Sequence, residues 1–151
     1  MNPSLVGSEM CIRDSPQGQP WRLAIESPGV SGGIAHIVSM TDGAVATSGD
    51  YRNYFEIDGK RYSHTIDPQS GYPTIHNLTS VSVIADSCAE ADAWATAMMV
   101  LGHKKGLELA NALDLAVYMV LNEGQTLKFT NSKAFEAYKD QNSKITSAKE
   151  I

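Results

Sequence analysis

The sequence changes its hydrophobic pattern abruptly at Ser87. The segment before it, LTSVSVIAD (78–86), is rich in β-branched residues and predicts a strand. The segment after it, CAEADAWATAMMVLG (88–102), is made almost entirely of apolar or small residues. Ser87-x-x-Glu90 is a capping box, which predicts that a helix begins at Cys88, and Gly102 can take the left-handed position that ends it. A strand therefore leads directly into a helix here.

Short strands dominate the rest of the chain. An Asp-Gly turn signal at 58–59 lies between two alternating aromatic-rich runs and predicts a hairpin over 53–67. A second hairpin, over 115–122 and 125–131, is expected around Glu123-Gly124. The remaining expected elements are strands at 21–26, 34–40 and 44–51 and helices at 104–113 and 132–140. This order predicts an α+β fold, with helices packed on a mostly antiparallel sheet.

Composition narrows the class of protein. A chain of 151 residues with 42% hydrophobic and 19% charged residues is typical of one globular domain. The net charge is −5 and no basic stripe stands out, which argues against nucleic-acid binding. No apolar run approaches the roughly 20 residues that span a bilayer. The two cysteines, Cys11 and Cys88, could pair, but a disulfide framework normally needs more, and Cys88 is expected to be a small core residue.

The two ends of the chain differ from its middle. Residues 1–15 have no clear hydrophobic period and no signal-peptide layout, and SLVGSEMCIRDS resembles translated read-through of a sequencing adapter. We therefore interpret 1–15 as a non-native segment outside the fold, the alternative being a disordered native N-terminus. The domain is expected over 16–140, followed by a polar, frayed tail at 141–151.

Asp92 and Thr96 are spaced i,i+4 and so share one face of the predicted helix. The apolar neighbours suggest burial on most sides of this helix, where an unpaired carboxylate would require a partner. No lysine or arginine lies within helical reach of Asp92, so a cation such as Mg²⁺ or Ca²⁺ is one solution, because both prefer oxygen ligands. The alternative is that Asp92 faces water, with Thr96 as a neutral neighbour.

A second cluster, SHTIDPQSGYP (63–73), follows a predicted strand. His64 could hydrogen-bond to or stack on a ligand, and Asp67 could accept a hydrogen bond from a ligand hydroxyl. The alternative is a structural Asp-Pro turn with an exposed histidine. A third cluster, DGAVATSGDYRNY (42–54), has small residues that permit close approach of a ligand, but it is not a phosphate-binding Walker loop. The histidines show no zinc-ligand spacing, and there is no G-x-S-x-G element.

In this order the three clusters resemble the C-terminal half of the ApbE family, the FAD:protein FMN transferases. The resemblance rests on S-H-x-I-D-P-x-x-G-x-P, then S-V-x-V-x-A, then E-A-D-A-x-A-T, and extends from about Trp21 to Tyr138. It implies the fold of those enzymes and transfer of the FMN moiety of FAD to a Thr or Ser hydroxyl of a target flavoprotein, with release of AMP. FAD is then a substrate, Mg²⁺ a cofactor and the acceptor flavoprotein a partner.

The resemblance also implies roles for residues. The Asp92 carboxylate, the Ala95 carbonyl and the Thr96 hydroxyl correspond to Mg²⁺ ligands. His64 corresponds to a catalytic residue, and its neighbourhood with Ile66 and Asp67 is expected to border the flavin nucleotide. Phosphoryl transfer needs charge neutralisation and alignment, which fits these assignments.

The family's N-terminal half has no counterpart in this sequence. SGGIAHI (31–37) looks superficially like its upstream metal-side segment but stands too close to the next motif and lacks the lysine. The sequence is therefore interpreted as a fragment, and it does not tell whether this fragment is active by itself. By resemblance the protein would act on the periplasmic side of the inner membrane, associated with it only through an N-terminal lipoprotein anchor that this chain lacks. Two alternatives remain: an FAD pyrophosphatase that yields FMN and AMP, and a non-catalytic flavin-binding module.

Overall fold

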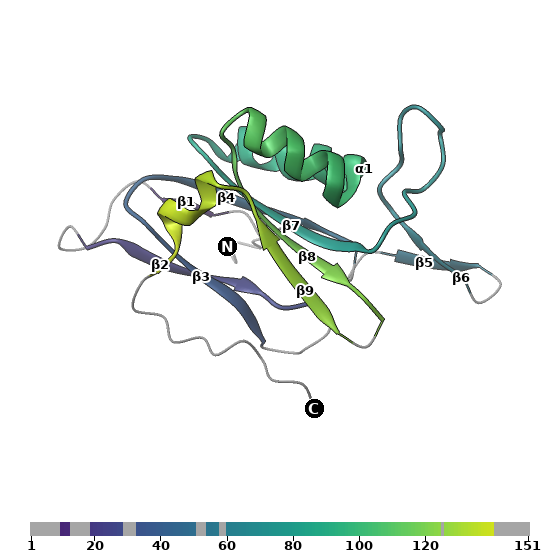
Figure 1. Cartoon of the computed structure of the whole chain (residues 1–151), viewed down its shortest axis with the longest axis horizontal. Coiled ribbons are helices and arrows are strands. Elements are labelled where there is room, and N and C mark those ends of the chain that lie inside the picture. Colours follow the sequence, from purple (N-terminus) through teal and green to yellow (C-terminus); the bar gives the residue numbers. More distant parts are fainter. Residues whose placement is uncertain are drawn as a thin grey trace, which may run out of the picture.

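A computed structural model describes residues 10–12, 19–28, 33–50, 54–57, 60–124 and 126–140 of the chain. Within them, five antiparallel strands form one sheet in the order β1-β4-β7-β8-β9 (Figure 1). Two further antiparallel hairpins, β2–β3 and β5–β6, lie outside this sheet. The strands are β1 (Met10–Ile12), β2 (Trp21–Glu26), β3 (Ile34–Met40), β4 (Gly43–Gly49), β5 (Tyr54–Ile57), β6 (Lys60–Ser63), β7 (Leu78–Ala85), β8 (Ala116–Asn122) and β9 (Leu127–Asn131). The helices are α1 (Cys88–Ala112) and the 3-10 helix η2 (Ala134–Tyr138).

The predicted α+β class with antiparallel strands is confirmed. β5 and β6 pair as a hairpin with Ile57 opposite Lys60, although the Asp58-Gly59 turn itself lies outside the described residues. The helix expected at 132–140 is only a short 3-10 turn. Within the segment interpreted as non-native, Met10–Ile12 pair with β4 and satisfy backbone groups that would otherwise lie at a sheet edge, while the non-native origin of 1–15 stays a prediction. The predicted tail at 141–151 lies outside the described residues.

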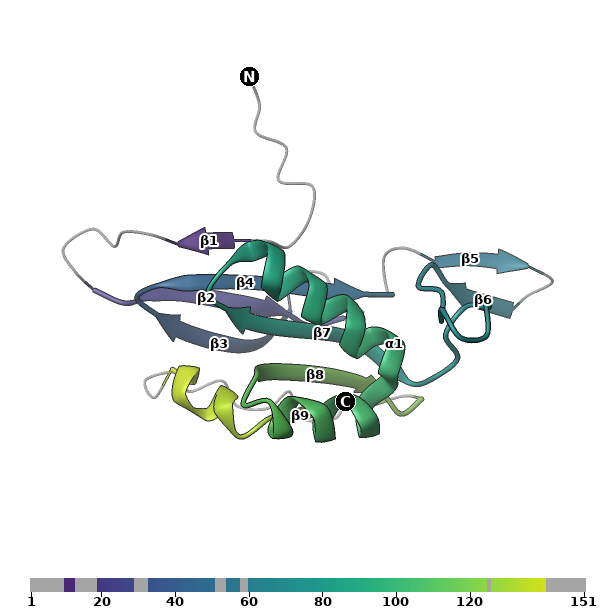
Figure 2. The ribbon, with the colours of Figure 1, turned by 90° about the horizontal axis from the view of Figure 1, so that it is seen from above.

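The two faces of the sheet carry different layers. α1 packs over β4, β7 and β8 on one face, while the β2–β3 hairpin and η2 cover the other (Figures 1 and 2). β8 serves both cores because alternate side chains point to opposite faces: Val117, Met119 and Leu121 join the α1 core, and Tyr118 and Val120 join the other. Among the described residues, no helix is both long and apolar enough to span a membrane.

A β-bulge resets the phase of β7. The pairing with β8 shifts between Leu78 and Ser80, so one extra residue is accommodated there. As a result Leu78 lies on the same side as Val81 and Val83, in the core beneath α1, although strict alternation would place it on the opposite side. Ser80 and Ser82 are also fully buried, and the Ser82 hydroxyl lies 2.7 Å from that of Thr47.

The second core is built around aromatic rings. Tyr118 lies 5.2 Å, centroid to centroid, from the buried Phe135, and His36 lies within 5.6 Å of both rings. Burial is the main cause that lowers the pKa of His36, followed by the charge of Lys139. Burial also raises the pKa of Tyr118 to about 12, so its phenol stays neutral and donates to the Ala35 carbonyl. These contacts hold β3, β8 and η2 together.

α1 starts where the sequence predicts. Ser87 is the N-cap, and its side chain accepts a hydrogen bond from the backbone N–H of Glu90 at 3.3 Å. Cys88, expected to be a small core residue, is instead half-buried and disulfide-bonded. The expectation fails because position 88 is in the first turn, at the margin of the face that packs on the sheet.

Gly102 divides α1 into two arms, 88–101 and 103–112. Its φ of 73° is positive, as expected for a helix-ending glycine, but its ψ of 173° turns the chain so that a second helical arm follows at once. The separate helix predicted at 104–113 is therefore this second arm. The arms pack closely at Gly106, where an added Cβ would lie 3.1 Å from the Met119 Cε and 3.3 Å from the Met98 Sδ. Figure 2 shows the bend.

Gly102→Ala is expected to lower the free energy of unfolding by about 1–3 kcal/mol, because this φ and ψ combination is essentially reserved for glycine. The new Cβ would also lie only 3.1 Å from the His76 Cδ2. Gly71→Ala is the matched control, since Gly71 has a φ of 72° and nothing within 4 Å of an added Cβ. Urea unfolding measures both variants. Equal losses would show that crowding at His76 contributes nothing.

Candidate functional site

The first arm of α1 is buried on only one side. Ala91, Ala95 and Met98 face the sheet, whereas Asp92 and Thr96 are exposed. The expectation of burial on most sides is wrong, because this arm lies on the surface of the sheet and its other alanines, such as Ala93, face outward. Asp92 thus needs no buried partner. The two side chains share one outward face, as their spacing predicts.

A residue from β4 joins this face. The Ser48 hydroxyl lies 3.2 Å from the Thr96 hydroxyl, so either can donate to the other. Ser48 belongs to the third sequence cluster, in which no single residue stood out. Alternation alone does not single out Ser48, because the face that each side chain of β4 takes is known only from its pairing: Thr47 points to Ser82, so the next side chain points to the helix side. Three hydroxyl or carboxylate groups, from Ser48, Asp92 and Thr96, thus lie on two packed elements.

The segment 64–77, which joins β6 to β7, carries the second cluster. Its tip is closed by backbone hydrogen bonds from Asp67 N–H to Tyr72, from Gly71 N–H to Asp67 and from Thr74 N–H to Thr65. Ile66 also pairs with Pro73 in an isolated bridge. The segment is therefore a closed, hydrogen-bonded loop. We call it the 64–77 loop, and it stands beside the bend of α1 (Figures 1 and 2).

The Asp67 carboxylate closes the turn. It accepts a hydrogen bond from the Gln69 N–H at 3.0 Å. This bond, followed by one from the Ser70 hydroxyl, lowers the pKa of Asp67. The structure thus shows the structural Asp-Pro turn that the sequence left open. His64 is exposed at the base of the loop, and Ile66 is 47% exposed.

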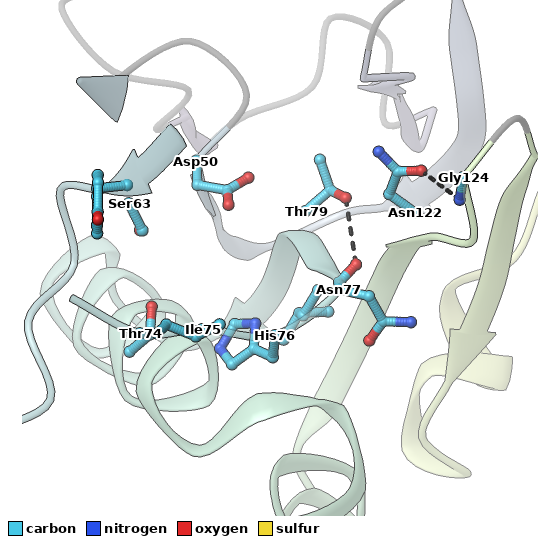
Figure 3. A pocket seen from close by; sticks show the side chains of 11 residues that line it. Asp50, Ser63, Thr74, Ile75, His76, Asn77, Thr79, Asn122 and Gly124 are labelled. Carbon is cyan, nitrogen blue, oxygen red and sulfur yellow. Dashed lines mark hydrogen bonds between the residues drawn. The ribbon is translucent and has the colours of Figure 1, made fainter. Parts of the chain in front are cut away.

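A cleft of about 670 Å³ opens between the base of the loop and the ends of β7 and β8 (Figure 3). His76 lines it, and its Nε2 donates a hydrogen bond of 2.6 Å to the Met99 carbonyl of α1. Two buried atoms at the cleft, the Thr74 Oγ1 and the His76 Nδ1, have no hydrogen-bond partner among the described residues. The remaining lining residues are Asp50, Tyr62, Ser63, Ile75, Asn77, Leu78, Thr79, Asn122 and Gly124.

The structure brings the predicted residues together on two neighbouring parts. Asp92, Ala95 and Thr96 lie on the first arm of α1, and His64, Ile66 and Asp67 lie on the loop that His76 links to that arm. The Ala95 side chain is buried, so only its carbonyl is a candidate ligand. In the described part of the chain, no group of three or more His, Cys, Asp or Glu side chains could hold a metal ion. A bound cation would need ligands of another kind.

The fold, with the first arm of α1 beside the 64–77 loop, defines the class of protein. The structure resembles the solved apo form of a flavinyl transferase from Pseudomonas stutzeri, with a TM-score of 0.72 and 49% identity over 86% of this chain and 40% of that one. It also resembles the ApbE protein of Thermotoga maritima, with a TM-score of 0.78 and 32% identity over 89% of this chain and 43% of that one. The fold is that of flavin transferases.

The chain belongs to the ApbE family, whose sequence profile matches residues 5–119. It is 48% identical over 135 residues to the FAD:protein FMN transferase of Salmonella typhimurium, which covers 88% of this chain and 39% of that protein. It is 47% identical over 123 residues to the Escherichia coli K12 enzyme of the same name, covering 81% and 35% of the two chains. The chain thus spans about two fifths of the length of these relatives.

Proposed function

We propose that this chain takes part in Mg²⁺-dependent transfer of the FMN moiety of FAD to a Thr or Ser hydroxyl of a target flavoprotein, releasing AMP. The observation that carries the proposal is the set of oxygen-bearing side chains of Ser48, Asp92 and Thr96, the last two of them exposed, in a chain 48% identical to a protein named for FMN transfer. Asp92 and Thr96 lie on the arm of α1 that the 64–77 loop contacts through His76, and Ser48 reaches that arm from β4.

The oxygen donors fit magnesium. Asp92 offers one carboxylate, Thr96 and Ser48 offer hydroxyls, and Ala95 offers a backbone carbonyl, all of which are hard ligands. Mg²⁺ usually keeps several waters and binds through one or two carboxylates plus substrate phosphates. A site with one exposed carboxylate and two neighbouring hydroxyls is consistent with this mode of binding. When bound, the ion would neutralise charge on the pyrophosphate oxygens of FAD.

The transfer forms one bond and breaks one. The acceptor hydroxyl oxygen attacks the phosphorus on the FMN side of the pyrophosphate, and the bond from that phosphorus to the bridging oxygen breaks, so that AMP leaves with this oxygen. The proton of the hydroxyl must be removed, and His64 on the exposed base of the loop is the proposed acceptor. Ile66, 47% exposed beside it, offers apolar surface to the flavin nucleotide. Asp67 holds the turn that presents both residues.

The decisive experiment incubates the chain with FAD, Mg²⁺ and an acceptor flavoprotein and follows products by mass spectrometry. The proposal predicts an FMN adduct on the acceptor and an equal amount of AMP, both lost when Mg²⁺ is removed. A His64→Ala variant should lose about 100-fold or more in rate, the typical range for general base catalysis. Free FMN with AMP and no adduct would indicate a pyrophosphatase instead. FAD binding with no product would indicate a non-catalytic module.

A further inference from the structure

We propose that His76 is a positioning residue: it fixes the 64–77 loop against the first arm of α1, and so sets the placement of His64 and Ile66 relative to Asp92 and Thr96. This inference rests on the proposed function for its consequence. Its structural basis is the hydrogen bond from the His76 Nε2 to the Met99 carbonyl.

The Met99 carbonyl needs a partner because the helix breaks three residues later. The last four carbonyls of a helical segment have no intrahelical amide to accept from. Gly102 ends the first arm, with a φ of 73° and a ψ of 173°, so Met99 falls within that last turn. His76 supplies the missing donor from outside the helix, at 2.6 Å. The side chain therefore acts as a C-terminal cap for the arm.

The break is also shaped to admit the imidazole ring. An added Cβ at Gly102 would lie 3.1 Å from the Cδ2, 3.7 Å from the Cγ and 3.8 Å from the Nε2 of His76. The ring thus occupies the space beside the glycine, where any other residue would place a side chain. Its neighbour Ile75 is 90% exposed at the rim of the cleft, whereas His76 is partly buried. Alternation along the loop directs one side chain into the break and the next outward.

The contact lies one turn from the proposed ligands. In an α-helix the carbonyl of residue 95 faces the amide of residue 99, so the peptide units at Ala95 and Met99 are consecutive links along one face. His76 donates to the carbonyl of Met99, and one turn earlier the Ser48 hydroxyl lies 3.2 Å from the hydroxyl of Thr96, the residue after Ala95. Without the His76 bond, the loop could shift relative to the arm, although both segments would keep their internal hydrogen bonds. Binding that needs both segments would then weaken.

The test compares two substitutions of similar size in the full chain. His76→Gln keeps an amide N–H donor near the position of Nε2, whereas His76→Phe keeps a flat ring and removes the donor. We expect Mg²⁺-dependent FAD affinity to fall about fivefold or more in His76→Phe, as the loss of one hydrogen bond would allow. The affinity of His76→Gln should stay within about twofold of wild type, because the bond is retained. Calorimetry with FAD, with and without Mg²⁺, measures both.

Amide hydrogen exchange of the free chain gives an independent readout. Faster exchange around 99–105 in His76→Phe, but not in His76→Gln, is expected if the side chain caps the arm. Wild-type affinity in His76→Phe, or equal losses in the two variants, would overturn the inference. If wild type shows no Mg²⁺-dependent FAD binding, the proposed function fails, and the exchange data alone decide whether His76 caps the arm. Unchanged exchange in His76→Phe would then show that His76 does not cap it.

Discussion

An Asp92→Asn variant is expected to transfer flavin about 100-fold or more slowly than wild type, since an ion that stabilises transition-state charge contributes several kcal/mol. The substitution removes the one carboxylate of the proposed ligand set while keeping the size of the side chain. Because Asp92 is exposed, the fold should not change. The rate of FMN incorporation into an acceptor, measured over a range of Mg²⁺ concentrations, tests this, and Mg²⁺-dependent FAD binding gives a second readout.

Glu90→Gln is the matched control for this variant. Glu90 is an exposed carboxylate on the same arm, two residues earlier, and the substitution removes the same charge. Its rate should stay within about twofold of wild type, as for most surface substitutions. Similar losses in the two variants would mean that the general negative charge of the arm matters, and the assignment of Asp92 as a ligand would have to be abandoned.

Phe135→Ala is expected to lower the free energy of unfolding by about 3–5 kcal/mol, the usual range for removing a buried phenylalanine. Phe135 belongs to η2 and is fully buried against Tyr118 and His36. The cavity would open where η2, β3 and β8 meet. Urea unfolding should show a lower midpoint with an unchanged slope.

Phe129→Ala provides the comparison. Phe129 also stacks on Tyr118, at a centroid distance of 6.2 Å, but it lies on β9 and is 38% exposed. Its removal leaves a gap open to water, so a loss of only about 1 kcal/mol is expected. If the two variants lose equal stability, the core around η2 is not the tightly packed region that burial indicates.

Local signals in the sequence were sufficient for most of the fold. β2 and β3 have the predicted bounds, β4 ends at Gly49 and the first arm of α1 begins after Ser87, because alternation, turn glycines and capping residues act within a few positions. The helix at 132–140 was predicted too long. Within that range the structure has only the five-residue 3-10 helix η2, whose Phe135 packs into the core.

The faces of the elements were harder to predict. The alanine-rich arm of α1 looks buried all round, because alanine is among the residues most often found fully buried. Only the packing on β4 and β7 shows which of its alanines face solvent. The bulge after Leu78 is likewise a property of the pairing with β8 and leaves no composition signal.

The candidate site was predicted in part. The i,i+4 spacing correctly placed Asp92 and Thr96 on one face, but their roles stay a prediction. Ser48 and His76 were missed because each acts through a contact distant in sequence: 48 positions separate Ser48 from Thr96, and 23 separate His76 from Met99. Such pairs follow from the antiparallel order of the sheet, which single-sequence patterns do not specify.

The layer beneath α1 has a mechanical consequence. Met98, Met99 and Met119 fill much of the space between the two arms and the sheet, whereas Val81, Val83 and Val117 line the sheet itself. Methionine is unbranched, with three rotatable bonds, and can refill a changing gap, while valine is stiff at its first torsion. The helical arms therefore pack on flexible methionine side chains, which in turn pack on the stiffer valines of the sheet. Small displacements of the arm that bears Asp92 and Thr96 can be absorbed by thioether side chains without opening voids in the core.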